Sequence, residues 1–155
     1  MSVFAFALLV CLALLLLVAA VIDIRSRIIP NGLNAVIAGA ALLWWLAMGF
    51  TWGAILAQIG MATAITLVFA GFFFLGWMGG GDVKLLGALA LWLPLEQMAF
   101  VLVWMAIGGG VLTIGMLIAH RVRRAEGRPE IPYGVAIVGA ALLALTNDIL
   151  TSGVA

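Results

Sequence analysis

The sequence contains very little charge. Only seven Lys or Arg and six Asp or Glu occur among its 155 residues, so charged residues make up 8% of the chain. A soluble domain averages about 25% charged residues, and these side chains are therefore too few to cover a surface in water. Hydrophobic residues instead make up 67% of the chain. This composition excludes an ordinary globular protein and indicates a protein embedded in the lipid bilayer.

Cysteine and histidine are scarce as well. The single cysteine, Cys11, cannot form an internal disulfide or a two-cysteine zinc site. The single histidine, His120, lacks the further ligands that a metal site needs. We therefore expect no metal and no other cofactor. The net charge of +1 also leaves no basic or acidic tail, which argues against nucleic acid as a partner.

The apolar residues form a series of long runs. A transmembrane helix needs about 20 mostly apolar residues, and polar or glycine-rich breaks separate the runs of this chain. We predict spans at residues 3–22, 33–50, 54–78, 83–95, 99–119 and 133–150. The fourth is the shortest, and it could extend past Pro94 to Met98. The fold class predicted is all-α: one transmembrane domain over residues 1–155, with six transmembrane helices.

The basic residues are distributed unevenly between the connections. All of them fall in the first, third and fifth connections, which six crossings place on one side of the membrane: Arg25, Arg27, Lys84, Arg121, Arg123, Arg124 and Arg128. Basic connections face the cytoplasm in most membrane proteins. We therefore predict that these three connections are cytoplasmic and that both termini lie outside. In a bacterial cell this corresponds to a multi-pass protein of the inner membrane.

Two carboxyl groups stand out as candidates for chemistry. Four of the six acidic side chains lie in external or polar segments, where they would simply be exposed to water: Glu96, Glu126, Glu130 and Asp148. Asp23 and Asp82 instead lie where predicted spans meet the cytoplasmic face, and ionisable residues at such positions are candidates for function. Two carboxyl groups in one pocket can share a proton, one acting as a base on water and the other as an acid.

Simpler roles are open for both aspartates. Asp82 could be the N-cap of the fourth helix, since aspartate is a favoured cap. Asp23 could pair with Arg25 or Arg27. The run Gly79–Gly81 before Asp82 favours the catalytic hypothesis, because glycines allow a close approach of the backbone that a cap does not need.

Three segments of the sequence resemble motifs of one family, the type IV prepilin peptidases. Asp23-Ile24-Arg25-Ser26-Arg27-Ile28-Ile29-Pro30-Asn31 resembles the first motif of that family. Gly79-Gly80-Gly81-Asp82-Val83-Lys84-Leu85-Leu86 resembles the second, of the GxGD type. Ile131-Pro132-Tyr133-Gly134-Val135-Ala136-Ile137 resembles the segment that opens the last helix. The motifs occur in the family's order and the resemblance covers essentially the whole chain.

The resemblance implies an aspartic endopeptidase that removes the basic leader of prepilins or pseudopilins at the cytoplasmic face. Asp23 and Asp82 match the two catalytic aspartates. Six further residues match motif positions and are candidates for supporting roles: Arg25, Pro30, Asn31, Gly79, Gly81 and Lys84. The chain is similar to the short branch that serves Flp/Tad pili, and the archaeal preflagellin enzymes are a related possibility. It has no room for the cysteine-rich domain of bifunctional members, so we expect no methyltransferase activity.

The sequence leaves the proton assignment of the two aspartates open. Asp82 lies at a predicted helix N-terminus, where the helix dipole favours the charged form, and Asp23 lies at a C-terminus, where the dipole disfavours it. The positive charges of Arg25 and Arg27 act in the opposite direction, because they favour the charged form of Asp23. The pair would then titrate as a unit.

Two other classes of protein compete with a peptidase. A transporter or channel subunit usually places ionisable groups near the middle of the membrane, but the middle of each predicted span lacks Asp, Glu, Lys and Arg. A structural subunit of a pilus or secretion machine would use the polar stretch of residues 121–132 as a docking surface.

Overall fold

The protein is helical throughout the part of the chain that the structure describes. The computed structural model describes residues 2–123 and 133–152, which contain six helices and no strand. The helices are α1 (Val3–Ser26), α2 (Asn31–Ala47), α3 (Trp52–Phe74), α4 (Gly80–Ala90), α5 (Leu95–Arg123) and α6 (Tyr133–Ser152). The predicted all-α fold is confirmed for these residues, and residues 124–132 of the predicted docking loop lie outside them.

Three of the six helices have the length and composition of a membrane span. These are α1, α3 and the part of α5 from Leu95 to Arg121. α2 and the Tyr133–Asn147 part of α6 are apolar but shorter. α4 has 11 residues, which at about 1.5 Å per residue rise only about 16 Å. The hydrocarbon core of a bilayer is about 30 Å thick, so α4 alone is too short to cross it.

Several helix ends differ from their predicted positions. α1 continues through Asp23 to Ser26, which places this aspartate inside the last helical turn. α3 ends at Phe74, and Gly76 follows with a φ of 73°, a left-handed conformation that suits glycine. The possible extension of the fourth span to Met98 is wrong. Proline cannot continue a helix, and the carbonyl of Pro94 instead accepts the N–H of Met98 at 2.9 Å in the first turn of α5.

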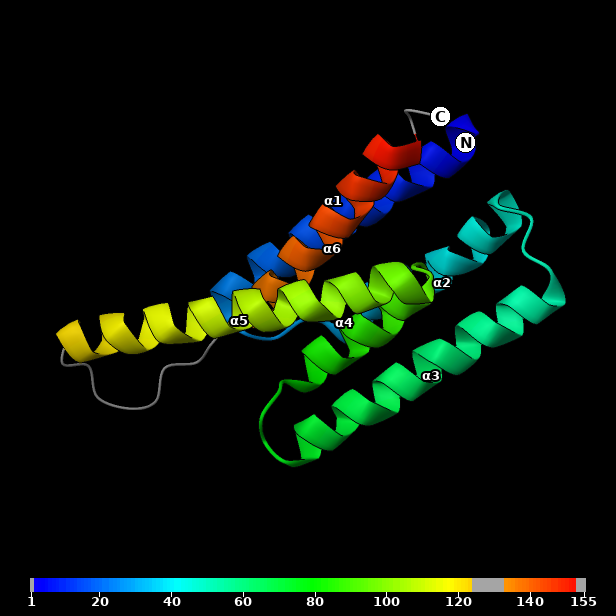
Figure 1. The fold of residues 1–155 in the computed structure, drawn as a ribbon. Coiled ribbons are helices and arrows are strands. Elements are labelled where there is room, and N and C mark those ends of the chain that lie inside the picture. The colour runs from blue at the N-terminus through cyan, green and yellow to red at the C-terminus, as the bar shows by residue number, and fades with distance from the viewer. Residues whose placement is uncertain (1, 124–132, 153–155) are drawn as a thin grey trace.

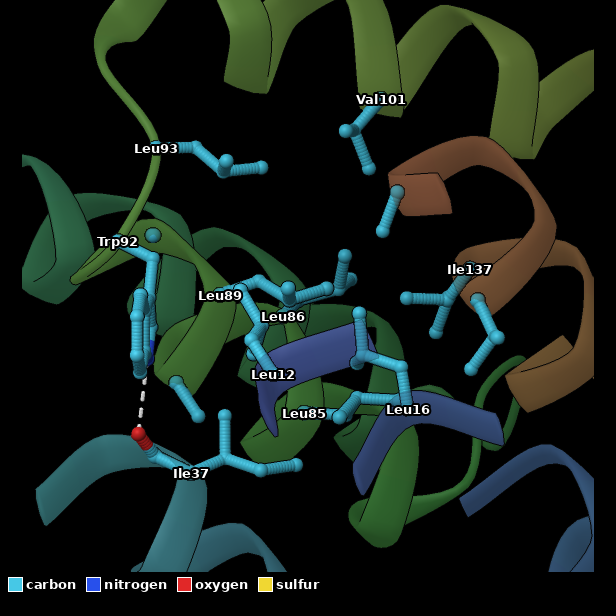
Figure 2. Packing of buried hydrophobic residues seen from close by; sticks show 14 of the residues in the cluster. Leu12, Leu16, Ile37, Leu85, Leu86, Leu89, Trp92, Leu93, Val101 and Ile137 are labelled. Carbon is cyan, nitrogen blue, oxygen red and sulfur yellow. Dashed lines mark hydrogen bonds between the residues drawn. The ribbon is translucent and has the colours of Figure 1, made fainter. Parts of the chain in front are cut away.

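The short α4 lies at the centre of the helix packing. It contacts α2, α3, α5 and α6, while α1 packs beside α6 and α5 packs across α6 (Figure 1). Seven of the 11 residues of α4 are buried. Figure 2 shows this core, in which α4 leucines meet side chains from the other helices: Leu12, Leu16, Ile37, Leu85, Leu86, Leu89, Val101 and Ile137. Lipid gives little hydrophobic drive between helices, so such close packing holds them together.

Side chains of neighbouring helices satisfy the backbone where α4 ends. The side-chain amide of Gln58 donates to the carbonyls of Ala90 at 2.8 Å and Leu93 at 2.7 Å. The indole of Trp45 donates to the carbonyl of Leu91 at 2.8 Å. In lipid, non-helical backbone is tolerated only where protein groups satisfy it. These bonds from α2 and α3 therefore allow the chain to leave α4 inside the protein and start α5.

We predict that Gln58→Leu destabilises the protein by about 1–3 kcal/mol, the usual cost of leaving a buried hydrogen-bonding group unsatisfied. Leucine keeps the bulk of the side chain but donates to neither carbonyl. Unfolding of the purified protein by a denaturing detergent measures the change. Thr63→Val on the same helix is the control, because it removes a local, exposed bond to the carbonyl of Ile59. Equal stability of the two variants would contradict the prediction.

Candidate active site

A cavity of about 650 Å³ opens at the end of the bundle where α1 finishes and α4 begins. Its wall comes from five places: the end of α1, the connection between α1 and α2, the connection between α3 and α4, the start of α4, and the start of α6. Asp23 and Asp82, the two aspartates singled out in the sequence, both line it. The cavity therefore combines residues from segments that lie far apart in the chain.

Asp23 lies in the last turn of α1 and faces the first turn of α6. Its side chain is 4% exposed, and its Oδ2 is buried without a hydrogen-bond partner. The backbone N–H groups of Gly134 and Val135 lie close enough to interact with this carboxyl group. These groups belong to the free N–H set at a helix N-terminus, which favours a negative charge nearby. The start of α6 thus supplies positive potential at Asp23.

Asp82 is the third residue of α4 and is 8% exposed. The N-cap of that helix is Gly79. The alternative role of Asp82 as the N-cap is therefore wrong, because Asp82 lies three residues further along the chain. Its carboxyl group instead turns back toward the backbone N–H of Gly79, as the third residue of a capping box does. A Cβ on Gly79 would lie 3.0 Å from Oδ2 of Asp82, so glycine leaves room for this turn.

The two carboxyl groups interact electrostatically across the cavity. Arg27 is the basic residue that acts on Asp23, whereas Arg25, which the sequence offered as an equal partner, is exposed. Two buried carboxylates repel each other, which favours a state in which the pair holds one proton. The arrangement is able to perform acid–base chemistry on a water molecule between the two groups.

Glycines let three segments meet around Ile29, a buried residue of the connection between α1 and α2. A Cβ on Gly81 would lie 3.1 Å from the Cβ of Ile29 and 3.3 Å from its backbone nitrogen. A Cβ on Gly134 would lie 3.0 Å from Cδ1 of Ile29 and 2.7 Å from Oδ2 of Asp23. The close approach expected from the glycine run is therefore present, and it includes α6 as well as α4.

The remaining motif residues brace the site from the side of α2. Pro30 is the N-cap of α2, and the exposed Lys84 donates a hydrogen bond of 2.7 Å to Oδ1 of Asn31. Asn34 donates to the carbonyl of Gly81 at 3.1 Å and is 5% exposed. Sequence reasoning missed Asn34, although a polar side chain inside an apolar helix is a usable signal.

Other groups with reactive side chains lie apart from this cavity. Cys11 is a free, exposed cysteine of α1. The described residues contain no group of three or more His, Cys, Asp or Glu side chains placed to hold a metal ion. Ile131 and Pro132 of the third motif fall outside the described residues, whereas Tyr133 lines the cavity wall.

The fold and the site define a helical membrane protein with two buried carboxyl groups in one cavity. The model of the type IV leader peptidase family matches residues 10–114, more than half of the chain. The chain therefore belongs to this family of peptidases. No curated protein and no solved structure matches the chain. The matched range contains both aspartates and ends before α6, so the position of α6 at the site is seen in the structure and lies outside the matched range.

We predict that Gly134→Ala lowers leader-peptide cleavage by about 100-fold, the scale of loss expected when a reacting group shifts by about 1 Å. The added Cβ would displace the Asp23 carboxyl group, because 2.7 Å is shorter than any ordinary contact. Cleavage rates of the purified enzymes measure the effect. Gly139→Ala on the same helix is the control, since nothing lies within 4 Å of its Cβ. Equal activity of both variants would argue against this contact.

Proposed function

We propose that this protein is an aspartic endopeptidase that removes the leader of type IV prepilins, with Asp23 and Asp82 as its catalytic pair. One observation carries the proposal: two buried aspartates from separate helices line a single cavity, in a chain that belongs to a leader peptidase family. Neither aspartate is explained as a surface group, because both are more than nine-tenths buried. Substrate binding, by contrast, requires an open cavity, and this one reaches the end of the bundle.

The surroundings of the two aspartates support different roles. Asp23 faces the N–H groups that start α6 and also the positive charge of Arg27. Asp82 faces a single backbone N–H, that of Gly79. Because positive potential stabilises a carboxylate, we assign the charged form to Asp23 and the shared proton to Asp82. Asp23 then acts as the base and Asp82 as the acid.

In this mechanism Asp23 takes a proton from water while the water oxygen bonds to the carbonyl carbon of the scissile peptide. The carbonyl π electrons move onto the oxygen. When that oxygen re-forms the C=O bond, the C–N bond breaks and Asp82 gives its proton to the leaving nitrogen. Asp23 ends protonated and Asp82 ionised, and exchange of one proton with water restores the resting pair.

The charge pattern supports an orientation with the cavity on the cytoplasmic side. Three of the basic residues stand near the two aspartates in the sequence, namely Arg25, Arg27 and Lys84. The start of α1 and the end of α6 lie together at the opposite end of these helices (Figure 1). With six crossings, the positive-inside rule places both termini outside. α4 and the short segment after it would make the fourth passage and α5 the fifth, in the inner membrane of a bacterium.

We assign the enzyme to the branch that processes Flp-like prepilins, because its motifs resemble those of the prepilin peptidases and its sequence contains a single cysteine. No methyltransferase activity is proposed. The partners of the enzyme are then the prepilin and the surrounding lipid.

Asp23→Asn and Asp82→Asn are each expected to abolish leader removal when co-expressed with a tagged Flp-type prepilin. Asparagine keeps the size of the side chain, but it neither accepts a proton from water nor donates one at an acidic pKa. A gel shift of the prepilin reports the cleavage. Glu96→Gln, which changes an exposed carboxyl group of α5, is expected to cleave normally. Normal processing by either asparagine variant would exclude the catalytic pair.

Cysteine labelling tests the orientation. In a Cys11→Ala background, Thr51→Cys in the α2–α3 connection is expected to react with a membrane-impermeant maleimide in intact cells. Ser26→Cys at the end of α1 is expected to react only after the inner membrane is opened, since the two positions lie at opposite ends of α2. The reverse pattern would place the cavity outside.

A further inference from the structure

Arg27 presents a buried hydrogen-bond donor that has no partner. Its Nη1 atom is buried and makes no hydrogen bond, although the residue as a whole is partly exposed. Arg27 also lines the cavity that contains Asp23 and Asp82. Buried donors of folded proteins nearly always have partners, so each exception calls for an explanation. Because Nη1 itself is shielded from solvent, a ligand in the cavity would meet the partly exposed remainder of the Arg27 side chain.

The backbone of Arg27 supports a role for its side chain. It ends α1 with φ 57° and ψ 18°, the left-handed conformation. Glycine is the most common residue at such a helix end, because a Cβ is unfavourable there. An arginine at this position therefore gives up some stability. Its N–H donates to the carbonyl of Asp23 at 3.0 Å, which ties the two residues together.

The other basic groups near the site are engaged or turned away. Lys84 is exposed and donates to Asn31. Arg25 is exposed and is not part of the cavity wall. Among the residues that the structure describes, Arg27 is thus the cationic side chain placed to act inside the cavity.

We propose that the guanidinium group of Arg27 binds the carbonyl oxygen of the scissile peptide bond and stabilises the negative charge that forms on it. The inference rests on the proposed function, since it requires a peptide in the cavity. When the water oxygen bonds to the carbonyl carbon, the C=O π pair becomes a lone pair on that oxygen. The guanidinium is already charged and keeps all its protons, so Asp23 and Asp82 carry out both proton transfers.

This role predicts a specific kinetic signature. A donor that binds the oxygen mainly when it is negative lowers the barrier of the chemical step more than it strengthens substrate binding. Loss of one such donor typically costs about 10²- to 10³-fold in kcat. A residue that merely bound the ground state would change KM and leave kcat unchanged.

The test compares purified Arg27→Gln, Arg27→Lys and Arg27→Gly with wild type on a Flp-type prepilin. Arg27→Gln is expected to lose about 10²- to 10³-fold in kcat while KM changes little, and Arg27→Lys is expected to recover part of the loss through its charge. Arg27→Gly relieves the backbone and is expected to remain folded by thermal melting, yet to be as slow as Arg27→Gln. Arg121→Gln removes an exposed charge of α5 and serves as the control.

The pH profile separates this role from an effect through Asp23. If Arg27 acted only by keeping Asp23 ionised, Arg27→Gln would regain its rate at higher pH. We expect a uniform loss over the pH range in which wild type is active. Recovery at high pH, a kcat near that of wild type, or a change confined to KM would each overturn the proposal. A wild-type enzyme that fails to cleave would instead refute the proposed function itself.

Discussion

The need to satisfy the backbone inside a membrane governs the architecture around α4. This helix is too short to cross the bilayer: it begins at the cavity and ends within the bundle, where its carbonyls need polar partners from the protein. At the C-terminal end, Gln58 and Trp45 supply donors to the carbonyls that the helix leaves free. At the N-terminal end, the free N–H groups and the glycine run make a polar mouth in which Asp82 turns back toward its own helix. The start of this short helix thus places the carboxyl group of Asp82 in the wall of the cavity.

The site also depends on how closely the chain can approach itself. Ile29 packs against Gly81 of α4 and Gly134 of α6, and at both glycines a Cβ would press against it. Ile29 therefore lies in close contact with the starts of α4 and α6, next to the end of α1. Asn34 and the Lys84–Asn31 bond fix the same region from the other side. Packing and hydrogen bonds between helices thus hold the two carboxyl groups in place.

The sequence predicted the elements of the fold better than their ends. Long apolar runs with polar breaks suffice to place six helices, because the requirement for apolar residues is strict in lipid. They do not show where a helix stops inside the protein, which is why Met98 was offered to the fourth span rather than to α5. Charge and motif singled out Asp23 and Asp82, but the proximity of Gly134 and the orphaned Nη1 of Arg27 arise from tertiary contacts. Spacing along the chain offered Arg25 and Arg27 equally as partners of Asp23. The left-handed backbone conformation of Arg27 distinguishes the two in the structure.

α6 contributes to the site although it comes last in the chain. Its first turn faces Asp23 and its Gly134 sits against that carboxyl group, while both aspartates precede it by many residues. A ribosome would therefore insert Asp23 and Asp82 into the membrane well before the helix that positions one of them. During synthesis both carboxyl groups would be present before the helix that positions one of them, so the proposed site would form only when the final helix docks.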